Sequence, residues 1–173
     1  MCAICYKVFV LNPRRLLSEP YSVIDGVFYD EAILGHKNTV WYNQANAWTI
    51  DPKSDGTEIS IAQSSIQSLF ANGGNSWASA QVFEPPFAVE FDLLAITGEL
   101  SIYVLGNNFI SHGFSQNGSG HYKLIITGSK VYKIKDGENI QTPYDKEMAG
   151  LFQIGFRGTT ANAKYKNFVV YPI

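Results

Sequence analysis

Charge is scarce in this sequence, and neither sign dominates. Only 16% of the 173 residues are Asp, Glu, Lys or Arg, whereas an average soluble protein has about 25%. The formal net charge of −2 provides no basic field for a phosphate backbone or for anionic lipid. The apolar stretches are interrupted within a few residues, far short of the roughly 18 residues of a membrane-spanning helix. We therefore expect a folded protein with no nucleic-acid partner and no membrane partner.

Cysteine and histidine are also rare. The two cysteines, Cys2 and Cys5, form one C-x-x-C without a second pair, and the three histidines complete no zinc-ligand spacing. Asp51 and Asp55 share one predicted turn but have no further acidic neighbour at a calcium-ligand spacing. We predict no metal and no cofactor, and we interpret the cysteines as reduced, partly buried thiols.

The residues that are abundant indicate an all-β chain. Aromatic residues make up 14% of the sequence, and there are 15 glycines, a composition typical of many short strands joined by turns. Runs of alternating apolar and polar residues are separated by turn signals, among them Thr97-Gly98, Asp136-Gly137 and Gly158-Thr159-Thr160. Residues 66–70 fit either one helical turn or a strand edge or loop. The predicted strands are 27–34, 39–50, 58–62, 88–94, 100–105, 109–114, 121–127, 130–135, 150–157 and 164–171.

The order of motifs from about residue 48 to 173 is distinctive. It runs through W-T-I-D, D-G-T-E-I-S-I, S-W-A-S-A and P-P-F-A-V-E-F-D-L to G-H-Y-K-L-I-I-T-G-S-K-V-Y-K-I-K-D-G, G-L-F-Q-I-G-F-R-G and K-Y-K-N-F-V-V-Y. This order resembles the concanavalin A-like, laminin-G-like jelly-roll modules of lectins, surface adhesins and tail or capsid-associated proteins of viruses.

The resemblance implies a specific all-β fold, a two-sheet antiparallel jelly-roll sandwich in which one sheet curves so that its outer face forms a shallow groove. Calcium occurs in the family, but the acidic spacing described above does not support it here. Alternation within the strands predicts a set of inward side chains independently of the family. These are Phe87, Val89, Phe91, Leu93, Leu124, Ile126, Phe168 and Val170.

Glu90 and Asp92 lie two apart in a predicted strand, so both project from the face opposite Phe91. Laminarinase-type glycoside hydrolases of the same fold carry E-x-D-x-E or E-x-D-x-x-E on such a strand, with the last Glu as general acid. Here Leu94 and Ala95 occupy the positions of that Glu, so no group can protonate the leaving group. We predict a non-enzyme, with a degenerate hydrolase as the remote alternative. The two carboxylates either contact a sugar or lie on a solvated face.

Aromatic side chains next to amides are the second candidate site. Trp41, Tyr42 and Asn43 in the run W-Y-N-Q-A-N-A-W, together with Trp77, combine flat rings that stack on a pyranose with groups that bond its hydroxyls. Burial in the core is the alternative for each tryptophan, and we expect Trp48 to be buried.

Asn107, His112 and Arg157 complete the candidate ligand-binding residues. Asn107 belongs to a Gly-Asn-Asn segment that either forms the rim of a groove or turns the chain. His112 flanks a second Gly-rich and Asn-rich loop. Arg157 is the only basic residue of its strand, and its guanidinium pairs with either an internal Asp or an acidic sugar.

The N-terminal segment shows no secretory signal, because its short apolar run precedes Arg14 and Arg15 instead of following them. A trimmed or wrongly chosen start is the alternative explanation. Pro13 and Pro20 interrupt this region, so we predict an arm over residues 1–26 that adds a strand to a neighbouring subunit, and one domain over residues 27–173.

Together these features predict a non-catalytic, lectin-like carbohydrate-binding module on a virion or extracellular surface, reached without a Sec signal. It would mediate host or glycan attachment by binding a cell-surface or cell-wall polysaccharide. Its arm would contact virion subunits or further copies of the chain in a homo-oligomer. The alternative is a structural virion subunit, a capsid decoration or a tail or fibre component, that binds no glycan.

Overall fold

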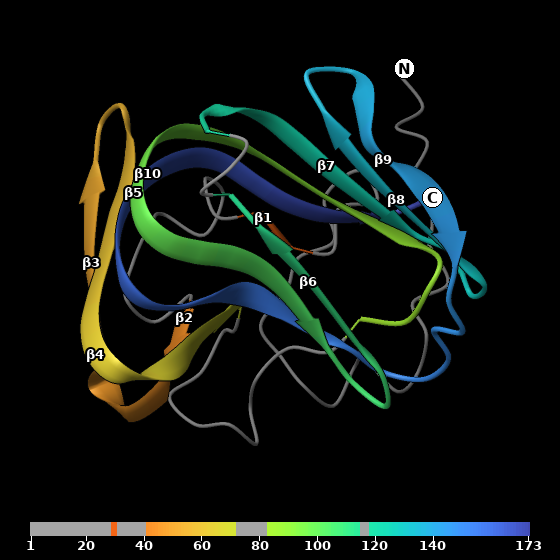
Figure 1. The fold of residues 1–173 in the computed structure, drawn as a ribbon, viewed down its shortest axis with the longest axis horizontal. Coiled ribbons are helices and arrows are strands. Elements are labelled where there is room, and N and C mark those ends of the chain that lie inside the picture. Colours follow the sequence, from red (N-terminus) through yellow and green to blue (C-terminus); the bar gives the residue numbers. More distant parts are fainter. Residues whose placement is uncertain (1–28, 31–40, 72–82, 115–117) are drawn as a thin grey trace, which may run out of the picture.

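The described part of the chain is one antiparallel sheet that folds over onto itself (Figure 1). The computed structural model describes residues 29–30, 41–71, 83–114 and 118–173. Its elements are β1 (Tyr29–Asp30), β2 (Trp41–Asn43), a 3-10 turn η3 (Gln44–Asn46), β3 (Trp48–Lys53), β4 (Gly56–Ala71), β5 (Phe87–Leu105), β6 (Phe109–Gly113), β7 (Gly120–Ile126), β8 (Lys130–Lys135), β9 (Glu138–Asp145) and β10 (Gln153–Pro172). No helix within these ranges has the length and apolar character to cross a membrane.

The strands follow the order β2-β4-β10-β5-β7-β8-β9. Three further strands pair alongside: β1 with β10, β3 with β4, and β6 with β5. Every one of these pairings is antiparallel. The strand β10 therefore lies inside the sheet, between β4 and β5.

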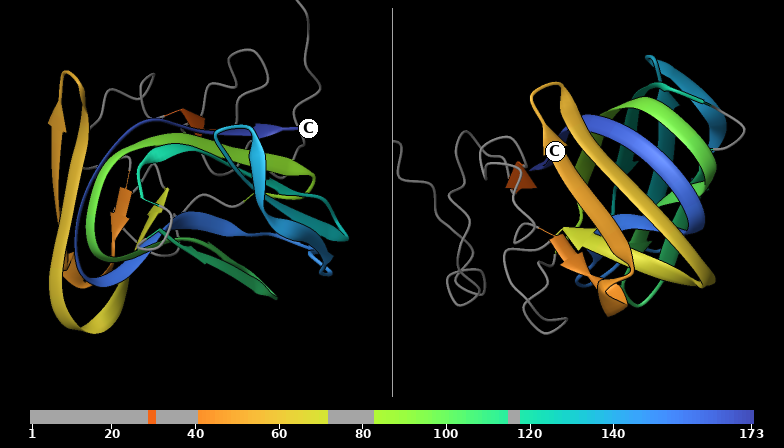
Figure 2. Two further views of the ribbon diagram at one scale, coloured as in Figure 1. Left: turned by 45° about the horizontal axis from the view of Figure 1, so that its top comes forward. Right: turned by 90° about the vertical axis from the view of Figure 1, so that its left-hand side faces the viewer.

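Three long strands, β4, β5 and β10, bend so far that each takes part in both layers of a sandwich (Figure 2). One layer contains β1, β3, β7, β8, β9, the first halves of β4 and β5 and the second half of β10. The other contains β2, β6, the second half of β5, the first half of β10 and the end of β4. This arrangement confirms the predicted all-β, two-layer sandwich.

The bend corrects two strand boundaries predicted from the sequence. Thr97-Gly98 and Gly158-Thr159-Thr160 do not end strands, because β5 and β10 run through them with shifts of register. Gly98 has a φ of +80°, and a Cβ there would lie 2.1 Å from the carbonyl oxygen of Thr160. Glycine therefore allows the two strands to cross closely at the bend. Residues 66–70, for which a helical turn, a strand edge or a loop was predicted, belong to β4.

The core between the two layers consists mainly of aromatic rings. All the side chains predicted to face inward are at most 1% exposed. Phe91 lies at the centre, with the rings of four other aromatic side chains each 5.6 Å away between centroids: Phe114, Tyr122, Phe156 and Phe168. Trp48 is 4% exposed, as expected. The Asp136-Gly137 turn has positive φ at both residues and joins β8 and β9 in a hairpin, which confirms the predicted turn.

Candidate functional site

Two outward faces carry the polar side chains that the sequence singles out. Glu90 and Asp92 lie on β5 in the layer that contains β7, whereas Arg157 lies on β10 in the layer that contains β6. The two groups therefore do not form one site, and each has its own partners.

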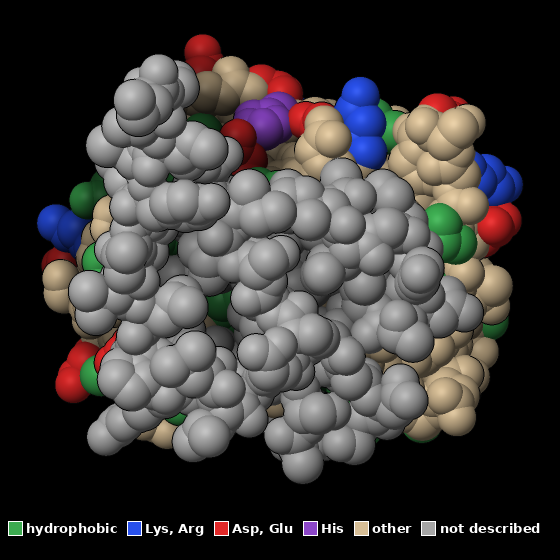
Figure 3. Space-filling view, turned by 180° about the vertical axis from the view of Figure 1, so that it is seen from behind, with side chains coloured by type: hydrophobic (Ala, Val, Ile, Leu, Met, Phe, Trp, Pro, Cys, Tyr) green, Lys and Arg blue, Asp and Glu red, His purple; other side chains and the backbone are tan. Residues whose placement is uncertain are grey.

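The first group, which we call the carboxylate cluster, joins three neighbouring strands, β7, β5 and β10. Its members are Glu90, Asp92, His121, Lys123, Asn167 and Tyr171. His121 bridges the two acids, with Nε2 3.0 Å from Glu90 Oε1 and Nδ1 2.7 Å from Asp92 Oδ1. Figure 3 shows histidine, acidic and basic side chains gathered along the upper margin of the face seen from behind.

The remaining carboxylate oxygens have partners as well. Glu90 Oε2 lies 3.2 Å from the Lys123 ammonium and accepts a 2.5 Å hydrogen bond from the Tyr171 hydroxyl. Asp92 Oδ2 accepts a 2.7 Å hydrogen bond from the Asn167 amide. Asn167 has a φ of +56° at a break in the register of β10 with β5, and this bulge directs its side chain to Asp92.

These contacts shift the titration of the cluster. Partial burial raises the pKa of Glu90, but hydrogen bonds from Tyr171 and Lys123 outweigh it and hold the pKa below 4.5. Burial likewise raises the pKa of Asp92, but the hydrogen bonds from His121 and Asn167 outweigh this effect and lower the pKa below 3.8. The hydrogen bond with Asp92 raises the pKa of His121 above 6.5 despite partial desolvation. The cluster is therefore an ionic cross-link between strands, since all four carboxylate oxygens already have partners.

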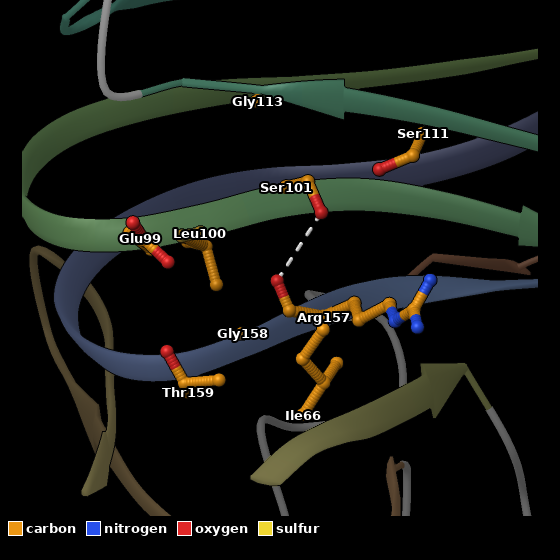
Figure 4. A pocket seen from close by; sticks show the side chains of 9 residues that line it. All are labelled: Ile66, Glu99, Leu100, Ser101, Ser111, Gly113, Arg157, Gly158 and Thr159. Carbon is orange, nitrogen blue, oxygen red and sulfur yellow. Dashed lines mark hydrogen bonds between the residues drawn. The ribbon is translucent and has the colours of Figure 1, made fainter. Parts of the chain in front are cut away.

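The second group surrounds a shallow groove with a volume of about 300 Å³. We call it the Arg157 groove (Figure 4). Its lining comes from four adjacent strands, β4, β10, β5 and β6, and consists of Ile66, Glu99, Leu100, Ser101, Ser111, Gly113, Arg157, Gly158 and Thr159. This volume is at the small end of the range for ligand sites.

Arg157 lies along the floor of this groove. On its two neighbouring strands it is paired with Ser68 and Ser101, and the Ser101 hydroxyl donates a 3.2 Å hydrogen bond to the Arg157 carbonyl. Its guanidinium carbon is 4.6 Å from the centroid of the Tyr103 ring. Among the described residues, no carboxylate oxygen lies within 4.0 Å of this guanidinium. Of the two partners predicted for Arg157, the internal Asp is therefore not found in that part of the chain.

Aromatic side chains extend the same face beyond Arg157. The rings of Tyr103 and Phe109 are 6.2 Å apart, and Phe109 is 53% exposed. The ammonium of Lys146 lies 5.1 Å from the centre of the Phe109 ring and donates a hydrogen bond to the Phe109 carbonyl. Sequence reasoning missed these three residues. The available signal for Tyr103 was alternation: within residues 100–105 it lies between Ile102 and Val104, so its side chain points to the opposite face from theirs.

A second hollow, over β3, β4, β5 and β10, contrasts with the groove because its charges are paired internally. Lys164 lies 2.6 Å from Asp55 and 3.7 Å from Glu58, while Lys53 lies 2.8 Å from Glu58 and 3.4 Å from Asp51. Asp51 and Asp55, which were considered for calcium, thus each face a lysine. In residues 41–71, 83–114 and 118–173, no group of three or more His, Cys, Asp or Glu side chains has the arrangement of a metal site.

The residues of the run W-Y-N-Q-A-N-A-W do not form the predicted binding platform. Trp41 is 2% exposed, because its register opposite Ala71 turns the ring inward, 5.0 Å from the ring of Phe168. The Asn43 side-chain amide accepts a 3.0 Å hydrogen bond from the Trp48 N–H and donates a 2.7 Å hydrogen bond to the Trp48 carbonyl. These two bonds close the turn around η3. Tyr42 is half-buried and pairs with Phe70 on the outward side of β2 and β4.

The remaining candidates are separated in space. Asn107 is exposed in the turn between β5 and β6. His112 faces inward from β6, with its ring 5.7 Å from Phe114 and 6.1 Å from Tyr122, so it is not at the rim of a groove. Burial, helped by the charge of Lys133, lowers the pKa of His112 to about 4. Trp77, the cysteines and the predicted arm lie outside the described residues.

Similarity to solved structures supports the architecture. The chain is similar to a Bacillus subtilis protein of unknown function with a galectin-like fold, with a TM-score of 0.58 and 12% identity over 84% of this chain and 96% of that one. It is also similar to the carbohydrate-binding module CBM66 from Bacillus subtilis, with a TM-score of 0.53 and 11% identity over 77% of this chain and 96% of that one. At such identities the likeness shows the fold alone. No protein-family model and no curated protein matches the sequence.

Proposed function

We propose that this chain is a non-catalytic, lectin-like carbohydrate-binding module, displayed on a virion or cell surface, that binds polysaccharide in the Arg157 groove. The observation that supports this most directly is the arrangement of Arg157 over Tyr103, in a groove whose other polar groups are hydroxyls and one carboxylate. One of the two structural neighbours reported above is itself a carbohydrate-binding module, which agrees with the proposal.

The groove has the chemistry that a sugar requires. Planar donors and hydroxyl oxygens hydrogen-bond the hydroxyls of a saccharide, while apolar surface packs against its C–H groups. Arg157, Ser101 and Ser111 provide the polar groups, and Ile66 provides apolar surface that is 52% exposed. A site this shallow gives weak affinity by itself, so we propose that several copies displayed together supply the avidity needed for attachment.

In this function the carboxylate cluster carries out no chemical step. General acid catalysis requires a carboxylic acid that is protonated near neutral pH, whereas the pKa values of Glu90 and Asp92 are both lowered. Leu94 occupies one position of the missing acid and carries no proton to donate.

A glycan-binding assay tests this function. The full-length chain, multimerised on a carrier, is applied to a broad glycan array and to cell-wall polysaccharides, together with Arg157→Ala and Lys130→Ala variants. Lys130→Ala is a suitable control, since it also removes one positive charge, and the ion pair of Lys130 with Asp145 is 3.6 Å long and exposed. We expect binding that Arg157→Ala abolishes and Lys130→Ala retains. Failure to bind any glycan, combined with self-association, would instead support a structural subunit.

A further inference from the structure

The Arg157 groove lies beside a concentration of positive charge that the described acidic side chains leave unbalanced. Of the described lysines other than Lys133 and Lys146, all except Lys166, whose charge acts on Asp92 in the carboxylate cluster, have a carboxylate oxygen within 4.0 Å. These paired lysines are Lys53, Lys123, Lys130, Lys135 and Lys164. Arg157, Lys146 and Lys133 have no such partner in the parts of the chain described here.

These three cations are connected through one set of contacts. Arg157 lies over the Tyr103 ring, Tyr103 is next to Phe109, and Lys146 lies over the Phe109 ring, so the two cations mark the two ends of one aromatic pair. Lys133 reaches the same region from the other layer, with its ammonium 3.5 Å from the carbonyl oxygen of Ser111. Ser111 also lines the groove.

The titration of Lys133 agrees with an excess of positive charge. Lys133 is only 8% exposed, and this burial lowers the pKa of its ammonium group. Repulsion from Lys146 lowers it further. Since the whole chain carries a net charge of −2, this is a local field and not a general property of the surface.

We infer that the Arg157 groove selects an anionic glycan, whose carboxylate or sulfate group binds the Arg157 guanidinium while Lys146 provides further attraction. The inference rests on the proposed function, and it names the substrate class of that same site. A guanidinium over the Tyr103 ring presents N–H donors in the paired geometry that a carboxylate or sulfate accepts.

Glu99 limits how much negative charge the groove accepts. Its exposed carboxylate lines the end of the groove opposite the guanidinium (Figure 4) and has no cation within 4.0 Å among the residues described. It can accept hydrogen bonds from sugar hydroxyls, but it repels a second anionic group. The groove therefore fits one acidic group beside Arg157 and a neutral part of the sugar beside Glu99.

Pairs of polysaccharides that differ only in charge test the inference. The affinity of the full-length chain is measured for polygalacturonate against its fully methyl-esterified form, and for dextran sulfate against dextran. We expect the charged member of at least one pair to bind on the order of tenfold or more tightly, because hydrogen bonds between ionised groups are the strong ones. Binding of the uronate alone or of the sulfate alone identifies which anionic group is recognised.

Variants link the preference to the groove. Arg157→Ala should reduce the affinity for the charged polysaccharide on the order of tenfold or more, Arg157→Lys should reduce it less, and Lys130→Ala should leave it unchanged. Glu99→Gln should tighten binding, which a general loss of folding cannot produce.

The outcomes separate the two proposals. Equal binding of charged and neutral partners, with Arg157→Ala weakening both, would overturn the anionic preference and leave glycan binding intact. Binding of polyanions that is insensitive to both Arg157→Ala and Glu99→Gln would also overturn it. The absence of binding to any of the four polysaccharides and to the glycan array would refute both proposals together.

Discussion

Replacing Asp92 by Ala should lower the stability of the protein and leave glycan binding unchanged. The Asp92 carboxylate is 25% exposed and accepts two hydrogen bonds, from His121 and from Asn167, each 2.7 Å long. A hydrogen bond to a charged group contributes up to about 3 kcal/mol when it is buried. Partial exposure on both sides reduces this, so we expect a loss of about 2 kcal/mol from the free energy of unfolding.

Chemical denaturation measures this loss directly, and thermal melting provides a second value. For a domain of this size, 2 kcal/mol corresponds to a decrease in Tm of roughly 4 to 8 °C. Asp145→Ala is the matched control, because Asp145 is a carboxylate of the same layer with an 89% exposed side chain and one 3.6 Å ion pair. We expect that control to change the free energy of unfolding by no more than about 0.5 kcal/mol.

The effect should also depend on pH in a defined direction. The pKa of Asp92 in the folded protein lies below its ordinary value of 3.8, so its stabilising contribution is complete above that value and is lost as the pH falls through the folded pKa. The difference between Asp92→Ala and the unmodified protein should therefore be largest while Asp92 is ionised and His121 is protonated, decrease as His121 loses its proton at higher pH, and disappear in strong acid. An unchanged free energy of unfolding accompanied by lost glycan binding would refute the assignment of the carboxylate cluster as a structural cross-link.

Three further substitutions test other parts of the structure. His121→Gln should destabilise the protein most below pH 6.5 and progressively less as the pH rises through the raised pKa of His121, as denaturation from pH 5 to 9 would show. Phe91→Ala should cost about 4 kcal/mol, because it removes a fully buried ring that contacts four others, and a loss below about 2 kcal/mol would contradict this packing. Gly98→Ala should destabilise by about 2 kcal/mol or more through contact with the Thr160 carbonyl and a positive φ, whereas Gly128→Ala, where a Cβ meets nothing within 4 Å, should cost less than about 1 kcal/mol on the same denaturation curve.

The sequence was most informative where structure depends on local alternation. The spacing of Val89, Phe91 and Leu93 predicted which side chains face the core, because successive side chains of a strand point to opposite faces. The same rule placed Glu90 and Asp92 together on the outer face.

Features that depend on register between distant segments could not be predicted in this way. The partners of the two carboxylates, His121 and Tyr171, come from β7 and β10, and nothing in their own neighbourhoods indicates the pairing. Gly98 resembles a turn residue until Thr160 is known to lie against it. For Trp41 the sequence left open a binding surface or burial in the core, and its pairing with Ala71 decides for the core.

The position of β10 between β4 and β5 has a consequence for how the protein is made. The strand that holds β4 and β5 together is formed by residues 153–172, so neither layer can be completed until those residues have left the ribosome. The earlier strands must wait with unpaired edges, and pairing over such long sequence separations is slow. Synthesis should therefore produce a chain that is protease-sensitive throughout elongation and becomes resistant in one late step.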